Sequence, residues 1–182
     1  MCGIVGVVNF KKDIKEQEKL ISGMANSLEK RGPDESGIYL EHHVNLGHRR
    51  LSILDIENGK QPMSYKENGN TYTIVYNGQI YNSNELREVL IKKGFEFTGH
   101  CDTEVLLKAY VYYGKDVLKF LNGIFAFAIW NEKEKELFLA RDHFGIKPLY
   151  YTIRNGNFIF ASEIKAILKH PDVKAQIDSG RH

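Results

Sequence analysis

Residues 123–131, with the sequence GIFAFAIWN, are apolar at nearly every position. An antiparallel strand with one solvated face alternates apolar and polar residues, whereas this run leaves neither face polar. A strand here must therefore be covered on both faces, which requires structural layers on both sides of its sheet. This requirement constrains the fold more than any other segment of the chain.

Turn signals and β-branched runs predict that much of the remaining chain also forms strands. Residues 3–9, GIVGVVN, have the composition of a buried strand. Asn68-Gly69 and Asn155-Gly156 each separate two strand-like runs, as the turns of tight hairpins do. The other segments expected to form strands or hairpins are 37–41, 44–48, 51–54, 64–78, 135–142, 148–154 and 157–162.

Helical patterns interrupt these strands. The apolar residues of segment 14–30 fall on one helical face, which predicts an amphipathic helix. Further helices are predicted at 83–94 with Ser83 or Asn84 as N-cap, at 102–114 with Asp102 or Thr103 as N-cap, at about 115–121 and at 163–170. The whole pattern predicts an α+β fold, a four-layer αββα sandwich of two mostly antiparallel sheets.

Length and charge narrow the functional classes. The 182 residues suit one domain, and a net charge of +2 without a dense basic run indicates no nucleic-acid partner. No apolar stretch approaches a membrane span and no signal peptide precedes the first charges, so we expect a cytoplasmic protein without a membrane partner. The two cysteines form no C-x-x-C motif, and the seven histidines show no ligand spacing, which argues against a metal site.

Cys2 directly precedes the first predicted strand. If Met1 is removed, Cys2 carries both a thiol nucleophile and a free α-amine that can take the thiol proton. Taken alone, Cys2 is better explained as a small residue at the start of a buried strand, because buried free thiols are common. Motifs further along the chain decide between the two interpretations.

Six motifs follow one another along the chain: MCGIVG at the start, RGPD at 31–34, GHRRLSILD at 47–55, YNGQIYN at 76–82, CDTEVLL at 101–107 and ARDHFGIKPLYY at 140–151. Together they resemble the glutaminase domain of class II glutamine amidotransferases, in particular that of glutamine-hydrolysing asparagine synthetases of the B type. The resemblance covers residues 2 to about 178. It implies the N-terminal nucleophile hydrolase fold, in agreement with the predicted sandwich.

The resemblance implies a role for each matching residue. Cys2 attacks the side-chain carboxamide of glutamine, and Asn77 together with the backbone N–H of Gly78 stabilises the oxyanion. Arg50 holds the α-carboxylate of the substrate, and Asp102 holds its α-ammonium. The remaining substrate-binding residues implied by the resemblance are Leu51, Ile53 and Gln79.

Several of these residues also have a structural interpretation. Asn77-Gly78 has the sequence of a hairpin turn, although a predicted helix follows it instead of a return strand. Asp102 is a natural helix N-cap and could serve both purposes. Arg49 is expected either at the surface or behind the site, and Cys101 in the core or at the rim of the pocket.

Two groups of polar residues receive no catalytic role. Residues 31–34 are expected to form a structural loop near the nucleophile. His48 and His143 have no acidic partner at a telling spacing. The expected chemistry therefore rests on the thiol, the oxyanion donors and the two charged substrate-binding residues.

The chain is expected to be part of a longer synthetase. Residues 1–172 are predicted to form the glutaminase domain, and residues 173–182 the start of an interdomain linker or a vector-derived tail. The sequence carries neither a Ser-Gly-Gly-type pyrophosphate loop nor a Walker A motif. ATP and magnesium are therefore expected only in a C-terminal synthetase domain, and no cofactor in this one. The expected partners are glutamine and that synthetase domain, with a homodimer left open.

Two other functions remain as alternatives. The domain could supply ammonia to a different acceptor, because acceptor specificity lies outside it. It could also be a non-catalytic module that binds glutamine. The complete set of implied site residues argues against the second alternative.

Gln79 departs from the family pattern, in which this position is more often glutamate. A glutamine keeps a carbonyl acceptor for the α-ammonium but lacks the charge. We expect Gln79→Glu to keep glutamine turnover within about tenfold of the unmodified protein, measured as glutamate release. A larger loss would show that the neutral side chain is required.

Overall fold

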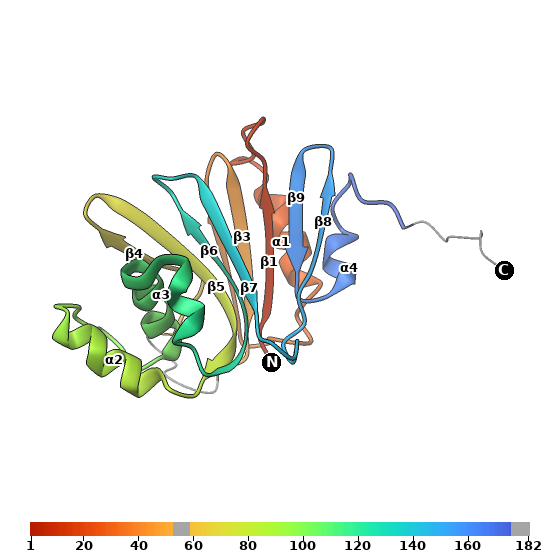
Figure 1. The fold of residues 1–182 in the computed structure, drawn as a ribbon. Coiled ribbons are helices and arrows are strands. Elements are labelled where there is room, and N and C mark those ends of the chain that lie inside the picture. The colour runs from red at the N-terminus through yellow and green to blue at the C-terminus, as the bar shows by residue number, and fades with distance from the viewer. Residues whose placement is uncertain (53–58, 176–182) are drawn as a thin grey trace.

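Two antiparallel sheets form the centre of the computed structural model, which describes residues 1–52 and 59–175 (Figure 1). The strand order is β2-β3-β1-β9-β8 in the five-stranded sheet and β4-β5-β6-β7 in the four-stranded sheet. The strands are β1 Gly3–Val8, β2 Glu35–Leu40, β3 Val44–Arg50, β4 Met63–Glu67, β5 Asn70–Ile80, β6 Gly123–Asn131, β7 Glu136–Arg141, β8 Tyr150–Arg154 and β9 Asn157–Ala161.

Helices cover the outer faces of both sheets. They are α1 Glu18–Asn26, α2 Ser83–Lys92, α3 Asp102–Tyr113, the 3-10 helix η1 Gly114–Lys119 and α4 Ile164–Ile167. In Figure 1, α2 and α3 flank the four-stranded sheet, whereas α1 and α4 lie on the opposite side of the molecule, against the five-stranded sheet. This arrangement confirms the predicted αββα sandwich. Among the described helices, none is long and apolar enough to cross a membrane.

Strand β6 lies between two apolar clusters. Phe125 and Phe127 pack in the cluster that includes residues of α2 and α3. Ala126 and Ala128, which point the other way, pack in the cluster between the two sheets. The prediction that this strand is covered on both faces is confirmed.

Both predicted Asn-Gly hairpins are confirmed. Asn68 and Gly69 join β4 to β5 with φ angles of 50° and 75°. Asn155 and Gly156 join β8 to β9 with φ angles of 51° and 80°. Positive φ at both central residues is the turn geometry that matches the twist of the flanking strands.

The first predicted helix is too long, because α1 covers Glu18–Asn26 instead of residues 14–30. Before it, Asp13 Oδ1 accepts a hydrogen bond from the backbone N–H of Lys15 at 2.9 Å, a local turn that competes with helix. After it, the chain continues in single turns with i→i+3 hydrogen bonds. Leu28 nevertheless stays in the apolar cluster beneath α1, so the apolar spacing extends beyond the helix.

Two other helix predictions are wrong in extent. The segment predicted as a helix at about 115–121 is the 3-10 helix η1, which begins at Gly114. Helix α4 ends at Ile167 and not at residue 170. Pro171 follows closely, and a proline disfavours helical backbone at the residue before it.

The predicted N-caps are also wrong. Asn82 and Cys101 are the N-cap residues of α2 and α3, and neither side chain makes a capping hydrogen bond.

The strand expected at 51–54 is absent at its first two residues. Strand β3 ends at Arg50, and the backbone N–H of Ser52 donates to Asp34 Oδ2 at 2.7 Å. The rest of that expected strand lies outside the described residues.

Candidate active site

A cavity of about 240 Å³ brings together the predicted site residues that the structure describes. Its walls come from the residues directly before β1, the end of β3, the last part of β5 and the start of α3. The predicted residues among those lining it are Cys2, Arg50, Leu51, Asn77, Gly78, Gln79 and Asp102. The remaining predicted residue, Ile53, lies outside the described residues.

Cys2 enters the cavity directly before β1. Its Sγ, which is partly buried, lies 3.8 Å from the carbonyl oxygen of Leu51. The backbone of Cys2 is held separately, because Arg31 Nε donates to its carbonyl oxygen at 3.0 Å. Arg31 in turn forms an ion pair with Glu163 at 3.2 Å. The loop at 31–34 thus holds the backbone of Cys2 through Arg31, in agreement with its expected position near the nucleophile.

Asn77 and Gly78 lie on β5, paired with β6, so the hairpin-turn interpretation of this pair is wrong. Among the described residues, Asn77 Nδ2 is buried and has no hydrogen-bond partner. A Cβ atom at Gly78 would lie 2.4 Å from the carbonyl oxygen of Ile124 and 2.8 Å from Phe125 Cα. Glycine is therefore required here for the close approach of two backbones.

Two neighbouring arginines have different surroundings. Arg50 ends β3, its side chain is 6% exposed, and Nη1 contacts Glu35 Oε2 at 2.8 Å. Arg49 Nε donates to the carbonyl oxygen of Gly32 at 2.9 Å. Arg49 therefore holds the 31–34 loop from behind the site, and the alternative of a surface position is wrong.

Asp102 is the first residue of α3 and not its N-cap. Its Oδ2 accepts hydrogen bonds from the Tyr76 hydroxyl at 2.7 Å and from the backbone N–H of Ile80 at 2.9 Å. Gln79 lines the same cavity and is exposed. Cys101 is buried and lines the cavity as well, in agreement with its expected position.

Sequence reasoning missed several residues of the cavity. Tyr76 immediately precedes the Asn-Gly motif, which could have drawn attention to it. Lys147 lies within the ARDHFGIKPLYY motif, and its Nζ contacts Met1 Sδ at 3.4 Å. Gln61 and Thr103 also line the cavity. Thr103 lies in the CDTEVLL motif but was predicted only as a helix N-cap, and Gln61 received no role.

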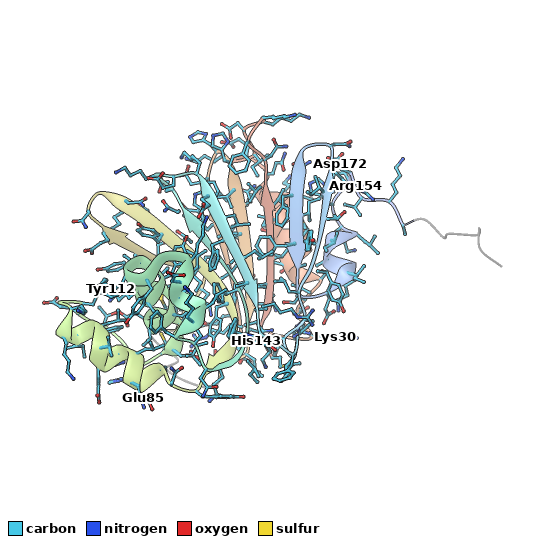
Figure 2. The ribbon with its side chains drawn as sticks, in the orientation of Figure 1. Lys30, Glu85, Tyr112, His143, Arg154 and Asp172 are labelled. Atoms are coloured by element: carbon cyan, nitrogen blue, oxygen red, sulfur yellow. The ribbon has the colours of Figure 1, made fainter. Side chains whose placement is uncertain are left out.

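Asp142 holds the loop that carries Lys147. Its two carboxylate oxygens accept hydrogen bonds from the backbone N–H groups of Phe125, Phe144, Ile146 and Lys147. Burial raises the pKa of Asp142, but these donors outweigh it and lower the pKa below its usual value. This loop also carries His143, which lies at the lower edge of the molecule in Figure 2 and is exposed.

The polar groups around Tyr76 have strongly shifted pKa values. Burial, followed by the charge of Asp102 and the hydrogen bond to it, raises the pKa of Tyr76 well above 10. Burial lowers the pKa of His48 to about 4, although its hydrogen bond with the Tyr76 carbonyl oxygen opposes the shift. Both side chains are therefore neutral near pH 7. Neutral His48 must carry its proton on Nε2 to donate to that carbonyl oxygen, 3.0 Å away.

The described residues offer no cluster of three or more His, Cys, Asp or Glu side chains that could hold a metal ion. The cavity instead combines a thiol, an unpaired amide donor, a guanidinium and a carboxylate. Two facing sheets between helical layers, with the thiol at the start of an inner strand, define the class of N-terminal nucleophile hydrolases.

Comparison with known proteins narrows this class. A family model described as "Glutamine amidotransferase domain" matches residues 1–181, and the chain belongs to this family. Asparagine synthetase [glutamine-hydrolyzing] 3 of Bacillus subtilis (strain 168) is 51% identical over 178 residues, which are 98% of this chain and 29% of that protein. Asparagine synthetase B [glutamine-hydrolyzing] of Escherichia coli (strain K12) is 37% identical, over 92% of this chain and 30% of that protein. The chain thus spans less than a third of these relatives.

A solved structure has the same fold. Glutamine phosphoribosylpyrophosphate amidotransferase from B. subtilis, in complex with ADP and GMP, superposes with a TM-score of 0.77 at 24% identity. The match covers 91% of this chain and 43% of that one. At this identity the comparison establishes the fold alone.

The low pKa of His48 predicts a pH-dependent stability. In the unfolded chain a histidine titrates near 6.5, so the unfolded state binds the proton first as the pH falls from about 6.5 to about 4. The contribution of His48 to stability is complete above pH 6.5 and is lost across this range. We expect the loss of this contribution to lower the free energy of unfolding by about 2–3 kcal/mol between pH 7.5 and pH 4.5.

Urea unfolding at these two pH values tests this expectation. His48→Gln keeps a hydrogen-bond donor but does not titrate, so it should lose less stability on acidification by about that amount. The exposed His143→Gln variant is the matched control and should behave like the unmodified protein. An equal loss of unfolding free energy in the unmodified protein and in His48→Gln would contradict the assignment of this pH dependence to His48.

Proposed function

We propose that this domain hydrolyses glutamine to glutamate and ammonia with Cys2 as the nucleophile. The observation that carries the proposal is the Nδ2 group of Asn77, which is buried without a hydrogen-bond partner among the described residues and belongs to the cavity that contains Cys2. A buried donor without a partner is costly, which is acceptable where a reaction supplies the acceptor. The acceptor in this proposal is the oxyanion of a tetrahedral intermediate.

The proposed reaction begins after removal of Met1, which frees the α-amine of Cys2. The amine takes the thiol proton, and Sγ attacks the carboxamide carbon of glutamine. Asn77 Nδ2 and the Gly78 N–H donate to the resulting oxyanion. The protonated amine returns the proton to the leaving nitrogen, and ammonia departs from a γ-glutamyl thioester. Water, deprotonated by the same amine, then hydrolyses the thioester to glutamate and restores the thiol.

Charged groups at the cavity hold the two charged groups on the α-carbon of the substrate in this proposal. The guanidinium of Arg50 binds the α-carboxylate, since its planar fork matches a carboxylate. Asp102 binds the α-ammonium, with the neutral Gln79 beside it as a carbonyl acceptor. Leu51 and Ile53 are proposed to contact the rest of the substrate.

The use of the ammonia is also part of the proposal. Residues 1–172 would form the glutaminase domain, and 173–182 the start of a linker, of a longer chain that makes asparagine from aspartate with ATP and magnesium in a C-terminal synthetase domain. The names and greater lengths of the relatives support this proposal. No cofactor is proposed for the glutaminase domain itself.

An exposed apolar surface supports a contact with such a second domain. Phe144 is 91% exposed and Ile146 is 54% exposed, although Asp142 holds both of their backbone N–H groups in place. A fixed loop that presents large apolar side chains is typical of a contact surface. A homodimer is the alternative use of this surface.

We also propose a cytoplasmic location, where two free cysteines remain reduced.

The two cysteines of the cavity provide a matched test of the nucleophile. We expect Cys2→Ala to lower glutamate release from glutamine by at least about 10³-fold, because it removes the thiol that forms the thioester. Cys101→Ala, at the same cavity but without an adjacent α-amine, should keep turnover within about tenfold. Intact mass must first verify that Met1 is absent from each protein. Glutamine hydrolysis that survives Cys2→Ala would contradict the proposal.

The proposed oxyanion donor has its own test. Asn77→Ala is expected to lower kcat for glutamine hydrolysis about 10²- to 10³-fold with little change in KM, because the donor acts in the transition state. Asn70→Ala is the control, since Asn70 lies at the far end of the same strand and bonds Asn131. A change confined to KM would instead assign Asn77 to substrate binding.

A further inference from the structure

Tyr76 links three parts of the site through three separate groups. Its backbone N–H donates to Gln61 Oε1 at 2.6 Å, and its carbonyl oxygen accepts from His48 Nε2 at 3.0 Å. Its hydroxyl donates to Asp102 Oδ2 at 2.7 Å. The side chain is almost completely buried, with 2% of the residue exposed. Tyr76 therefore connects β5, which carries Asn77 and Gly78, to α3, which carries Asp102.

A second contact strengthens this connection. Strand β4 pairs with β5 only as far as Ile74, so the N–H of Tyr76 meets the side chain of Gln61 instead of a strand partner. Gln61 Nε2 then reaches Thr103 Oγ1, on α3, at 3.5 Å. The residue after Asp102 is thus tied to the same tyrosine through a side chain.

The hydrogen bonds of Asp102 fix the orientation of its carboxylate. Both of its donors, the Tyr76 hydroxyl and the Ile80 N–H, bind Oδ2. Oδ1 accepts no hydrogen bond from the described residues, although Asp102 lines the cavity. One oxygen is therefore held by the protein, and the other is left for a ligand.

The charge of Asp102 has few substitutes at this site. Among the described residues that line the cavity, Asp102 is the only acidic side chain, because position 79 carries a neutral glutamine. Within the described lining, recognition of a ligand's ammonium group then depends on how the Asp102 carboxylate is placed. The Tyr76 hydroxyl remains a donor throughout the working pH range, because its pKa lies well above 10.

We propose that Tyr76 is a positioning residue that orients Asp102 and thereby sets the selectivity of the site for substrates with an α-ammonium group. The inference rests on the proposed function, since it takes Asp102 as the ammonium-binding residue. In this proposal Tyr76 acts through Asp102 and not by contact with the reacting atoms. Its loss should therefore affect recognition of one end of the substrate and leave the chemical step intact.

Comparison of two substrates in Tyr76→Phe tests this proposal. L-Glutamine has the α-ammonium, whereas 4-carbamoylbutanoate is the same molecule without it. We expect Tyr76→Phe to raise KM for glutamine about five- to tenfold with kcat within about twofold, and to leave both constants for the deaminated analogue unchanged. The variant should fold, because phenylalanine fills nearly the same space and the Ile80 N–H still binds Oδ2.

Two controls separate positioning from a general structural effect. Tyr65→Phe removes a tyrosine hydroxyl that donates to the carboxylate of Glu67, away from this cavity. This variant should leave kcat and KM unchanged for both substrates. In an Asp102→Asn background, Tyr76→Phe should cause no further loss of discrimination, because the charge that it positions is absent. An equal change for both substrates, or no change for glutamine, would overturn the proposal.

Binding measurements keep this test independent of turnover. Calorimetric titration of L-glutamine and of the deaminated analogue into Cys2→Ala, with and without Tyr76→Phe, should show the same selective weakening for glutamine. If the unmodified protein fails to hydrolyse glutamine, the proposed function fails, while selective binding would still support the role of Tyr76. If hydrolysis depends on Cys2 but discrimination is unchanged in Tyr76→Phe, only the inference about Tyr76 fails.

Discussion

The site depends on the apolar contact between the two sheets, because its parts come from both of them. Cys2 and Arg50 adjoin strands of the five-stranded sheet, whereas Asn77 and Gly78 lie on the four-stranded sheet. The two groups can meet only if the sheets pack in one fixed relation. Buried side chains from β1, β3, β5, β6 and β9 form the cluster that sets this relation.

Close packing makes that relation specific. A Cβ atom at Gly6, in the middle of β1, would lie 2.2 Å from a ring carbon of the fully buried Phe160. The glycine therefore lets a large aromatic ring fill the space beside the strand that begins after Cys2. Because interiors are packed as densely as crystals, a misplaced side chain here would shift β1 and the cysteine with it.

Buried polar contacts then orient the individual groups of the site. Arg31 holds the Cys2 carbonyl, Glu35 contacts Arg50, and Tyr76 binds Asp102. Each contact satisfies a polar group that would be costly to bury alone. Asn77 Nδ2 is buried without a partner among the described residues. Of the described side chains with a buried unpartnered nitrogen or oxygen, Asn77 is the one that lines the cavity.

Much of the fold could be predicted, because strands and hairpin turns are encoded locally. The apolar run at 123–131 indicated cover on both faces, and two Asn-Gly pairs marked hairpins that have the expected φ values. Helix ends were less predictable. The apolar spacing of residues 14–30 reflects which side chains are buried, and buried residues continue to Leu28, beyond the end of α1. The start of regular helix depends instead on a local turn, in which Asp13 accepts a hydrogen bond from the N–H of Lys15.

The sequence by itself determined much of the local conformation and, through its motifs, which residues were predicted to form the site. Seven of the eight predicted site residues lie in the described part of the chain, and all seven line one cavity. Only the tertiary structure decided what each one contacts: that Asn77-Gly78 is strand and not turn, that Asp102 bonds Tyr76 and is no cap, and that Arg49 lies behind the site. The physical reason is that these partners are distant in sequence. Their contacts depend on the packing of two sheets and a helix, which no local periodicity specifies.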